Sequence, residues 1–353
     1  MTSQPEPLAA ESDQFLAQAV VAWQASHGRH DLPWQNTRDP YKVWLSEIML
    51  QQTQVVTVLD YFARFLSRFP NVAALAQASL DEVLSLWSGL GYYSRARNMH
   101  RCAQDVMCLH AGVFPSTAQQ LQGLPGIGPS TAAAVASLCF SEKVAILDGN
   151  VKRVLTRYLG FDADLAVAGN ERRLWQEANR LLPDDDLSRN MPRYTQGMMD
   201  LGATLCTAKK PACAKCPLQT RCVAHALGSP QGFPVKTRRL KRSAQSLWLL
   251  WAQSDDGALW LSQRPTPGVW AGLYCFALFD SYEALQAAVP DGFREQLTDL
   301  PAFKHVLTHK DLHLHPVQVE LPHILKPDAL GAWFAPQQWQ RLGLPAPVSK
   351  LLR

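Results

Sequence analysis

The sequence predicts a mainly α-helical protein with a smaller α+β domain at its C-terminal end, and three observations carry this prediction. From about residue 12 to 228, apolar residues recur at three- and four-residue spacing, which is the period of an amphipathic helix. After a segment rich in proline and glycine, the pattern changes to β-rich runs around a turn signal. A chain of 353 residues is also long enough for two domains, because a single core is stretched at that size.

The helical pattern is clearest in two stretches of the first part. Aromatic and aliphatic residues share one helical face at Tyr61, Phe62, Phe65 and Leu66, and again at Leu80, Val83, Leu84, Leu86 and Trp87. Asp39-Pro40 indicates a helix start, because proline suits the first helical position. We therefore predict a helical domain over residues 1–228.

A linker is predicted over residues 229–242, within GSPQGFPVKTRRLKR, which ends with five basic residues in seven. A solvated segment explains this basic run as well as a phosphate contact does. Beyond it, SLWLLWAQ and ALWLSQ flank the turn signal Asp-Asp-Gly. Residues 243–353 are therefore expected to form the α+β domain.

Composition excludes several classes of protein. With 47% hydrophobic and 18% charged residues the chain is an ordinary globular protein, and a net charge of +4 supports a nucleic-acid partner only weakly. The first residues, MTSQPEPLAAESDQ, lack the basic and apolar regions of a signal peptide, and no apolar run approaches the roughly 20 residues of a membrane span. We expect an intracellular protein without membrane contact.

Eight cysteines in an intracellular chain favour metal binding over disulfides. Four stand among apolar neighbours and are expected to be core residues: Cys102, Cys108, Cys139 and Cys275. The other four form the pattern C-x6-C-x2-C-x5-C, at Cys206, Cys213, Cys216 and Cys222. A structural zinc site usually shows two C-x2-C pairs and only one is present, so the compact, uneven spacing favours a four-iron cluster.

Residues 121–135, LQGLPGIGPSTAAAV, predict two short helices joined by a tight turn. Gly126 and Gly128 allow the backbone to come close to a ligand, and Pro129 begins the second helix. The exposed N–H groups at that helix start form an anion site without side-chain charge. A generic helix–turn–helix link would use the same glycines.

Two carboxylates stand in unusual surroundings. Asp148, in VAILDGNVKRVL, lies between an apolar run and an amphipathic helix, where an isolated aspartate is most often an N-cap. Glu47, in WLSEIMLQQTQV, lies on a helix crowded with apolar residues. Desolvation there raises the pKa of a carboxyl, as a general acid near neutral pH requires, although most glutamates at a helix edge simply face solvent.

Together these motifs resemble the endonuclease III and MutY glycosylases, helix–hairpin–helix enzymes of DNA repair. The cysteine spacing followed by Pro217 is similar to their iron–sulfur loop (206–222), and LDGNVKRV to their aspartate motif. WLSEIMLQQTQV resembles the segment that distinguishes the MutY family, the adenine DNA glycosylases. The resemblance implies removal of adenine mispaired with 8-oxoguanine or guanine, and a 4Fe–4S cluster held by the four clustered cysteines. Lys209 and Lys210 lie on the loop between the first two cysteines, and because that loop is held at both ends we expect them to face phosphate rather than to be ordinary surface charge.

The resemblance implies a role for each matched residue. Glu47 protonates the departing adenine, Asp148 stabilises the oxocarbenium-like sugar or bonds to it transiently, and Asn150 supports it. The adenine must first flip out of the duplex. Gln52 and Tyr92 would wedge into the duplex, although Tyr92 would ordinarily be a core aromatic. Trp34 would lie near the adenine pocket, and the ordinary alternative is a structural tryptophan.

The bifunctional members of the superfamily form a Schiff base through a lysine just after the hairpin. Ser130 occupies that place, and no lysine occurs between Lys42 and Lys143. The sequence therefore predicts a monofunctional glycosylase. A bifunctional glycosylase/lyase and a non-catalytic iron–sulfur DNA-binding protein are the alternatives.

Residues 259–279 resemble the C-terminal domain of the MutY family, which has the Nudix fold. Nudix hydrolysis needs a glutamate-dense helix, and only Glu283 occurs nearby, so we predict a lesion-binding domain rather than a pyrophosphatase. FKHVLTHKDLHLHP matches the family's Phe-Ser-His loop, here Leu307-Thr308-His309, in which Thr308 would read the oxidised base.

A metal site at the four histidines of this segment is disfavoured, because no carboxylate or cysteine completes the set: His305, His309, His313 and His315. The resemblance further implies a monomer that binds double-stranded DNA containing an adenine:8-oxoguanine or adenine:guanine mispair. Its expected location is the bacterial cytoplasm, in association with the nucleoid.

Overall fold

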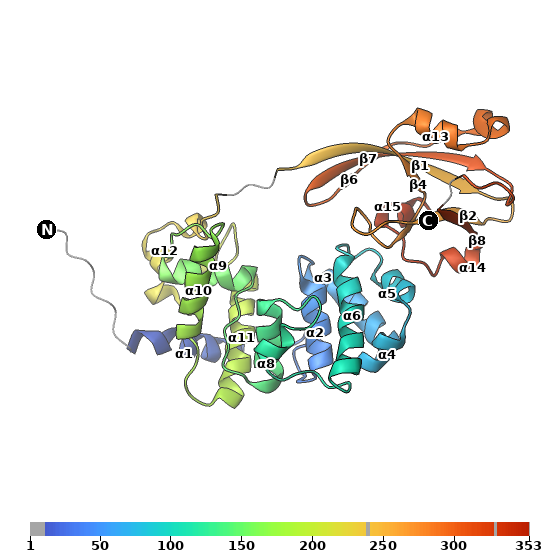
Figure 1. The fold of residues 1–353 in the computed structure, drawn as a ribbon. Coiled ribbons are helices and arrows are strands. Elements are labelled where there is room, and N and C mark those ends of the chain that lie inside the picture. The colour runs from blue at the N-terminus through green and yellow to red at the C-terminus, as the bar shows by residue number, and fades with distance from the viewer. Residues whose placement is uncertain (1–10, 238–240, 328–329, 353) are drawn as a thin grey trace. The chain divides into compact units, whose positions relative to one another are not determined.

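The structure of the protein, a computed structural model, describes residues 11–237, 241–327 and 330–352 (Figure 1). It contains two compact units, each built from two stretches of chain: Met1–Gln54 with Asp105–Arg239, and Val55–Gln104 with Leu240–Arg353. Most of the N-terminal segment without signal-peptide features, and Arg238 and Arg239 of the basic run, lie outside the described residues.

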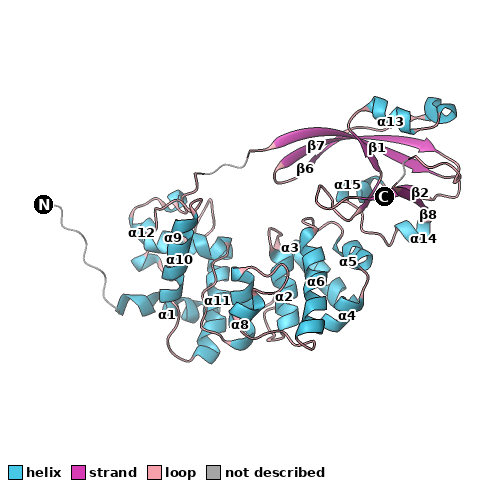
Figure 2. Cartoon of the chain, in the orientation of Figure 1, coloured by secondary structure: helices cyan, strands magenta, loops and turns pink. Residues whose placement is uncertain are grey.

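The first unit is helical, as the sequence predicts (Figure 2). Helices α1, α9, α10 and α11 bury their apolar faces in one core that includes Leu16, Val20, Leu155 and Met198. The unit's helices and 3-10 turns are α1 (Glu11–His27), α2 (Pro40–Leu50), α7 (Ala118–Leu121), α8 (Pro129–Phe140), α9 (Gly149–Leu159), α10 (Ala168–Arg180), α11 (Leu187–Thr204), η1 (Cys213–Lys215), η2 (Gln219–Arg221), α12 (Val223–Ala226) and η3 (Pro230–Gly232).

Local signals explain where these helices begin and how closely they pack. The side chain of Asp39 accepts a hydrogen bond from the Tyr41 N–H (2.9 Å), which caps α2 at Pro40 and confirms the predicted start. Gly202 lets α11 approach α9, because a Cβ at that position would lie 2.6 Å from the Cβ of Asn150. This close approach brings the start of α9 and the end of α11 together.

The second unit contains α3 (Val55–Arg68), α4 (Val72–Gln77), α5 (Leu80–Trp87) and most of α6 (Ser94–Leu109). Both predicted helical runs are confirmed, and Phe65 packs edge-on against Trp87 at 5.7 Å. Cys102, Cys139 and Cys275 are buried, but the prediction that Cys108 is a core residue is wrong. Cys102, Ala103 and Val106 define the buried face of α6, and Cys108 is exposed because it lies off that face.

A mixed sheet of eight strands among the described residues forms the rest of this unit. Its centre is the parallel pair β1–β7, with Ser243 opposite Lys310 and Gln253 opposite Glu320 (Figure 2). The strands are β1 (Ser243–Gln253), β2 (Leu259–Gln263), β3 (Tyr274–Cys275), β4 (Ala277–Phe279), β5 (Thr298–Asp299), β6 (Phe303–Val306), β7 (Lys310–Glu320) and β8 (Gly331–Phe334). The accompanying helices are α13 (Tyr282–Ala288), η4 (Asp291–Gln296), α14 (Pro336–Trp339) and α15 (Ala346–Leu351).

The sheet confirms the α+β character predicted for the C-terminal part. The two β-rich runs are β1 and β2, antiparallel around the Asp-Asp-Gly turn. Leu250, Trp260 and Val317 lie in the core beside the sheet. Within the described residues, the helices are too short or too polar to cross a bilayer.

Candidate functional site

Glu47 is a carboxyl with an unusually high pKa in the first unit. It lies on α2 between the buried residues Ser46 and Ile48 and is only partly exposed. Burial raises its pKa to about 7, the nearby charge of Asp148 raises it as well, and the guanidinium of Arg29 lowers it. A group with this pKa is able to carry a proton and to give it up near neutral pH.

Asp148 is the N-cap of α9 and also faces Glu47. Its Oδ1 accepts a hydrogen bond from the Val151 N–H at 2.8 Å, and its Oδ2 accepts one from the Asn150 side chain at 3.5 Å. Burial raises the pKa of Asp148 above its ordinary value. The hydrogen bonds from the backbone N–H groups of Val151 and Asn150, and the charges of Arg153 and Lys152, act against this rise. These contacts favour the carboxylate form of Asp148.

An ion pair between the partly exposed Arg29 and the buried Asp200 was not predicted from the sequence. Asp200 on α11 is fully buried, and its carboxylate accepts hydrogen bonds from the Arg29 Nε at 2.7 Å and from the Arg29 N–H at 3.0 Å. The Gln196 amide donates a further bond at 2.9 Å. This pair holds the Arg29 guanidinium where it acts on the pKa of Glu47.

A cavity of about 410 Å³ in the first unit is lined by Arg29, Trp34, Gln35 and Gln196. The predicted residue Trp34 is 6% exposed and forms part of the cavity wall. The side-chain nitrogen and oxygen of Gln35 are buried, and neither has a hydrogen-bond partner among the described residues. A buried amide without partners is costly, so its donor and acceptor favour a polar ligand in this cavity. Arg29 lines this cavity and also lowers the pKa of Glu47, although neither Glu47 nor Asp148 is among the described residues that line the cavity.

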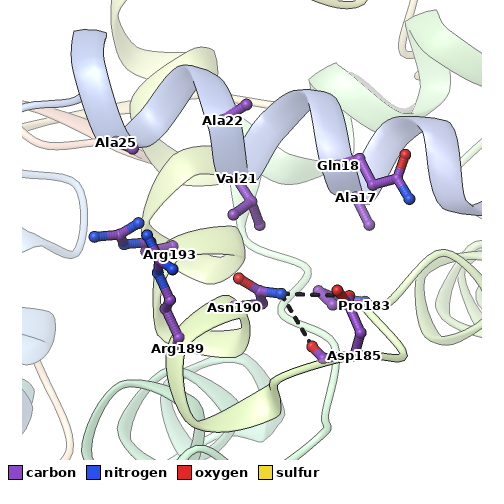
Figure 3. A pocket seen from close by; sticks show the side chains of 10 residues that line it. All are labelled: Ala17, Gln18, Val21, Ala22, Ala25, Pro183, Asp185, Arg189, Asn190 and Arg193. Atoms are coloured by element: carbon purple, nitrogen blue, oxygen red, sulfur yellow. Dashed lines mark hydrogen bonds between the residues drawn. The ribbon is translucent and has the colours of Figure 1, made fainter.

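A smaller cavity of about 270 Å³ lies between α1 and α11 (Figure 3). Arg189 and Arg193 line it one helical turn apart, and Arg193 also lines the larger cavity. The Asn190 side chain, also in the lining, donates to the Asp185 carbonyl at 3.0 Å. The described residues that line this cavity include none of the site residues predicted from the sequence.

The predicted hairpin is present between α7 and α8. Gly126 adopts a φ of +76°, which a side chain would strain. Gly128 caps α8 without a side-chain hydrogen bond, and a Cβ there would meet nothing within 4 Å. The N–H groups at the start of α8, near the partly exposed Ser130, are therefore open to an anion.

Gln52, just after α2, is exposed with a φ of +56°.

The four predicted cysteine ligands lie close together after α11. None forms a disulfide, and burial and the other three cysteines raise the pKa of Cys216 to about 11. Among the described residues, no group of three or more ligating side chains is arranged around a single metal ion. The thiols of a four-iron cluster surround a larger body, so all-sulfur donors in this spacing fit such a cluster better than one ion. Lys209 and Lys210, between the first two cysteines, are exposed.

Arg157 supports the same assignment. It is 2% exposed, its guanidinium donates to the Cys206 Sγ at 3.3 Å and to the Thr207 carbonyl at 2.8 Å, and no carboxylate among the described residues pairs with it. A buried cation needs a compensating negative charge, which cluster thiolates would supply. The neighbouring Arg153 donates to the Cys206 carbonyl at 2.7 Å and to the Asn150 side chain at 2.8 Å.

The second unit brings two predicted DNA-binding residues together. Tyr92 is 42% exposed with a φ of +48°, so it is not a core aromatic, and its hydroxyl is hydrogen-bonded to that of Thr308. Arg95 lies beneath the same loop: it is 9% exposed, lies 5.5 Å from the centre of the Tyr92 ring and donates to the Gly91 carbonyl.

Thr308 and His309 are exposed in the turn between β6 and β7. A cavity of about 660 Å³ is lined by Tyr92, Trp270, His305, Thr308 and His309. His313 and His315 alternate along β7, as predicted, and His315 stacks on Trp248 at 4.6 Å.

Arg242, at the end of the basic run, makes internal contacts. It pairs with Asp311 and donates to the Thr308 carbonyl at 2.9 Å. Its charge therefore stabilises the turn before β7. For this one residue of the run, a structural role accounts for the charge.

Comparison with known proteins agrees with this geometry. Residues 45–180 match the family of HhH-GPD superfamily base excision DNA repair proteins, and residues 248–353 match the NUDIX domain family. The chain is 37% identical to the adenine DNA glycosylase of Buchnera aphidicola subsp. Acyrthosiphon pisum, over 96% of this chain and 97% of that protein. It is 42% identical to the adenine DNA glycosylase of Mus musculus, over 58% of this chain and 41% of that protein.

Solved structures show a similar fold. A thermostable thymine-DNA glycosylase superposes with a TM-score of 0.54 at 26% identity, covering 62% of this chain and 98% of that chain. A non-covalent endonuclease III–DNA complex gives a TM-score of 0.52 at 20% identity, covering 63% and 99%. The second likeness shows the fold alone.

Proposed function

The chain belongs to the adenine DNA glycosylases, and from this premise we propose that it excises adenine paired with 8-oxoguanine or guanine. It is a DNA glycosylase of base excision repair, and its reaction is hydrolysis of the N-glycosidic bond. The carboxyl pair is the observation that supports this most directly, because Glu47 has a pKa of about 7 beside a hydrogen-bonded Asp148.

The two carboxyls divide the chemistry as in glycoside hydrolysis. Glu47 donates its proton to the departing adenine, which makes the base a better leaving group. Asp148 remains ionised and stabilises the positive charge that develops on the sugar, and Asn150 holds it in place through the 3.5 Å hydrogen bond. Water completes the reaction and leaves an abasic site.

The 410 Å³ cavity receives the flipped adenine. An amide donor and acceptor side by side can pair with one edge of adenine, so the unpartnered Gln35 is suited to read the base. Trp34 forms part of the wall. Gly126, Gly128 and Ser130 present the α8 N-terminus to a DNA phosphate, with Gln52 exposed to enter the duplex.

The second unit recognises the oxidised guanine. Thr308 and His309 present polar side chains at its 660 Å³ cavity. Tyr92, which lines the same cavity, wedges into the duplex near the mispair. The helix α13 carries one glutamate, Glu283, so this domain binds without hydrolysing nucleotides. The absence of a lysine at Ser130 makes the enzyme monofunctional.

The cofactor is a 4Fe–4S cluster held by Cys206, Cys213, Cys216 and Cys222. When bound, it cross-links the segment after α11 and supplies the negative charge that Arg157 requires. Lys209 and Lys210, on the loop between the first two ligands, face the DNA backbone.

We further propose that the enzyme acts as a monomer in the bacterial cytoplasm, at the nucleoid. Its two domains along the chain are residues 1–228 and 243–353, with 229–242 as their linker. This division assigns Val55–Gln104 to the first domain, whereas the compact units group that stretch with the C-terminal part. The basic composition of residues 236–242 suits passage close to DNA.

The test is base excision on duplexes with adenine opposite 8-oxoguanine, guanine or thymine, each analysed with and without alkali. Strand breaks in the first two duplexes that appear only after alkali are expected. Breaks without alkali would indicate the lyase alternative. An iron-loaded protein that removes no base from any duplex would leave the non-catalytic DNA-binding protein.

A further inference from the structure

We propose that Arg157 couples loading of the four-cysteine site to the anchoring of the interdomain linker. The proposal rests on the cluster assigned under the proposed function. Arg157 contacts two segments at once: its guanidinium donates to Cys206 Sγ (3.3 Å), and its Nε donates to the Pro230 carbonyl (2.7 Å). One buried side chain therefore joins the first cluster ligand to the first turn of the linker.

The cysteine side of this contact is extensive. Besides the sulfur, Arg157 donates to the carbonyls of Thr207 at 2.8 Å and Ala208 at 3.1 Å. The Cys222 Sγ lies 3.5 Å from the Arg157 carbonyl, so the last predicted ligand also meets this residue. Arg157 is a positioning residue for both ends of the cluster loop.

The linker side is held in two further places. The Leu165 N–H donates to the Val235 carbonyl at 3.1 Å. The Thr237 N–H donates to the Asp164 carboxylate at 3.3 Å, and the Thr237 hydroxyl bonds to the same group. Residues 230–237 are thus fastened to the first unit, although their composition is that of a linker.

Loading the site strengthens this connection. With thiolates bound to iron, the Arg157–Cys206 contact is a charge-assisted hydrogen bond, and the cluster fixes the Cys206–Ala208 backbone that holds the guanidinium. Without iron, the buried cation loses its compensating charge and both sets of contacts weaken. Release of residues 230–237 would add up to about 25 Å of reach to the tether of the second domain, which lowers its effective concentration at the DNA.

Trypsin cleavage after Lys236 measures how firmly residues 230–237 are held against the first unit. Lys236 is exposed and lies between the two anchoring residues, Val235 and Thr237. The full-length protein is compared with its iron and after iron removal by a chelator under reducing conditions. We expect cleavage after Lys236 to accelerate about tenfold or more without iron, because local opening limits proteolysis. Cleavage after the exposed Arg341 should not change.

Two variants distinguish an effect of the Arg157 contacts from a general loosening of residues 230–237. Arg157→Lys keeps the positive charge but cannot contact all these acceptors. Iron loss and cleavage after Lys236 should therefore both be faster. The cluster reduction potential should fall, because hydrogen bonds to sulfur favour the reduced state. Thr237→Val removes the hydroxyl bond of Thr237 to Asp164 without touching the cysteines. It should speed cleavage after Lys236 while leaving iron loss and the potential unchanged.

The outcomes distinguish the two proposals. Wild-type protein that binds no iron would contradict the cluster assignment itself. Iron that binds while Lys236 is cleaved equally fast with and without it would overturn only the coupling. An Arg157→Lys protein equal to the wild type in iron loss and potential would also overturn it.

Discussion

Replacing Glu47 with glutamine should stabilise the protein at alkaline pH while abolishing catalysis. The folded protein raises the pKa of Glu47 from 4.5 to about 7, chiefly by burial and secondly through Asp148. A carboxyl with a raised pKa destabilises the fold when it ionises, so this penalty is absent below the unfolded pKa and complete above the folded one. The rise corresponds to about 3 kcal/mol.

Urea denaturation near pH 4.5 and near pH 8 measures this difference. Glu47→Gln should match the wild type within about 1 kcal/mol at the lower pH and exceed it by up to about 3 kcal/mol at the higher one. Glu177→Gln is the control, because Glu177 is exposed and its pair with Arg180 contributes at most about 0.5 kcal/mol. A Glu47→Gln gain that is equal at both pH values would refute the origin assigned to the pKa of Glu47.

Three further changes test other parts of the site. Gln35→Ala should slow single-turnover adenine release at least tenfold without loss of stability, because its buried amide has no protein partner among the described residues; an unchanged rate would remove Gln35 from the adenine site. Asp200→Ala should lower the free energy of unfolding by about 2 kcal/mol, because the Arg29 and Gln196 donors lose their shared acceptor. An equally stable variant in urea would contradict this. Thr308→Ala should reduce the preference for 8-oxoguanine over guanine opposite adenine about fivefold, through loss of one hydrogen bond; equal kcat/KM ratios for the two proteins would contradict a role in lesion reading.

The sequence predicts local features of this protein well. The start of α2 at Asp39-Pro40 and the β1–β2 turn depend on neighbouring residues, so both could be assigned from the sequence and are confirmed. The crowding of apolar residues around Glu47 likewise predicted a raised pKa, and the structure gives about 7.

Contacts between distant segments were missed. The Arg29–Asp200 pair joins the segment after α1 to α11, and Arg157 joins α9 to the cysteine loop and the linker. No periodicity or short motif marks such pairs, since each depends on how helices pack. Arg95 is a further case, because its guanidinium donates to the Gly91 carbonyl beneath the Tyr92 loop and no short motif marks that contact.

The most direct test of the proposed chemistry is single-turnover release of free adenine from an adenine:8-oxoguanine duplex by the wild type and by Glu47→Gln. The wild type should release adenine, at a rate that falls as the pH rises above about 7, because the acid must be protonated. Glu47→Gln should bind the duplex normally and release adenine at least about 100-fold more slowly. Adenine release by Glu47→Gln at the wild-type rate would contradict the assignment of Glu47 as the general acid.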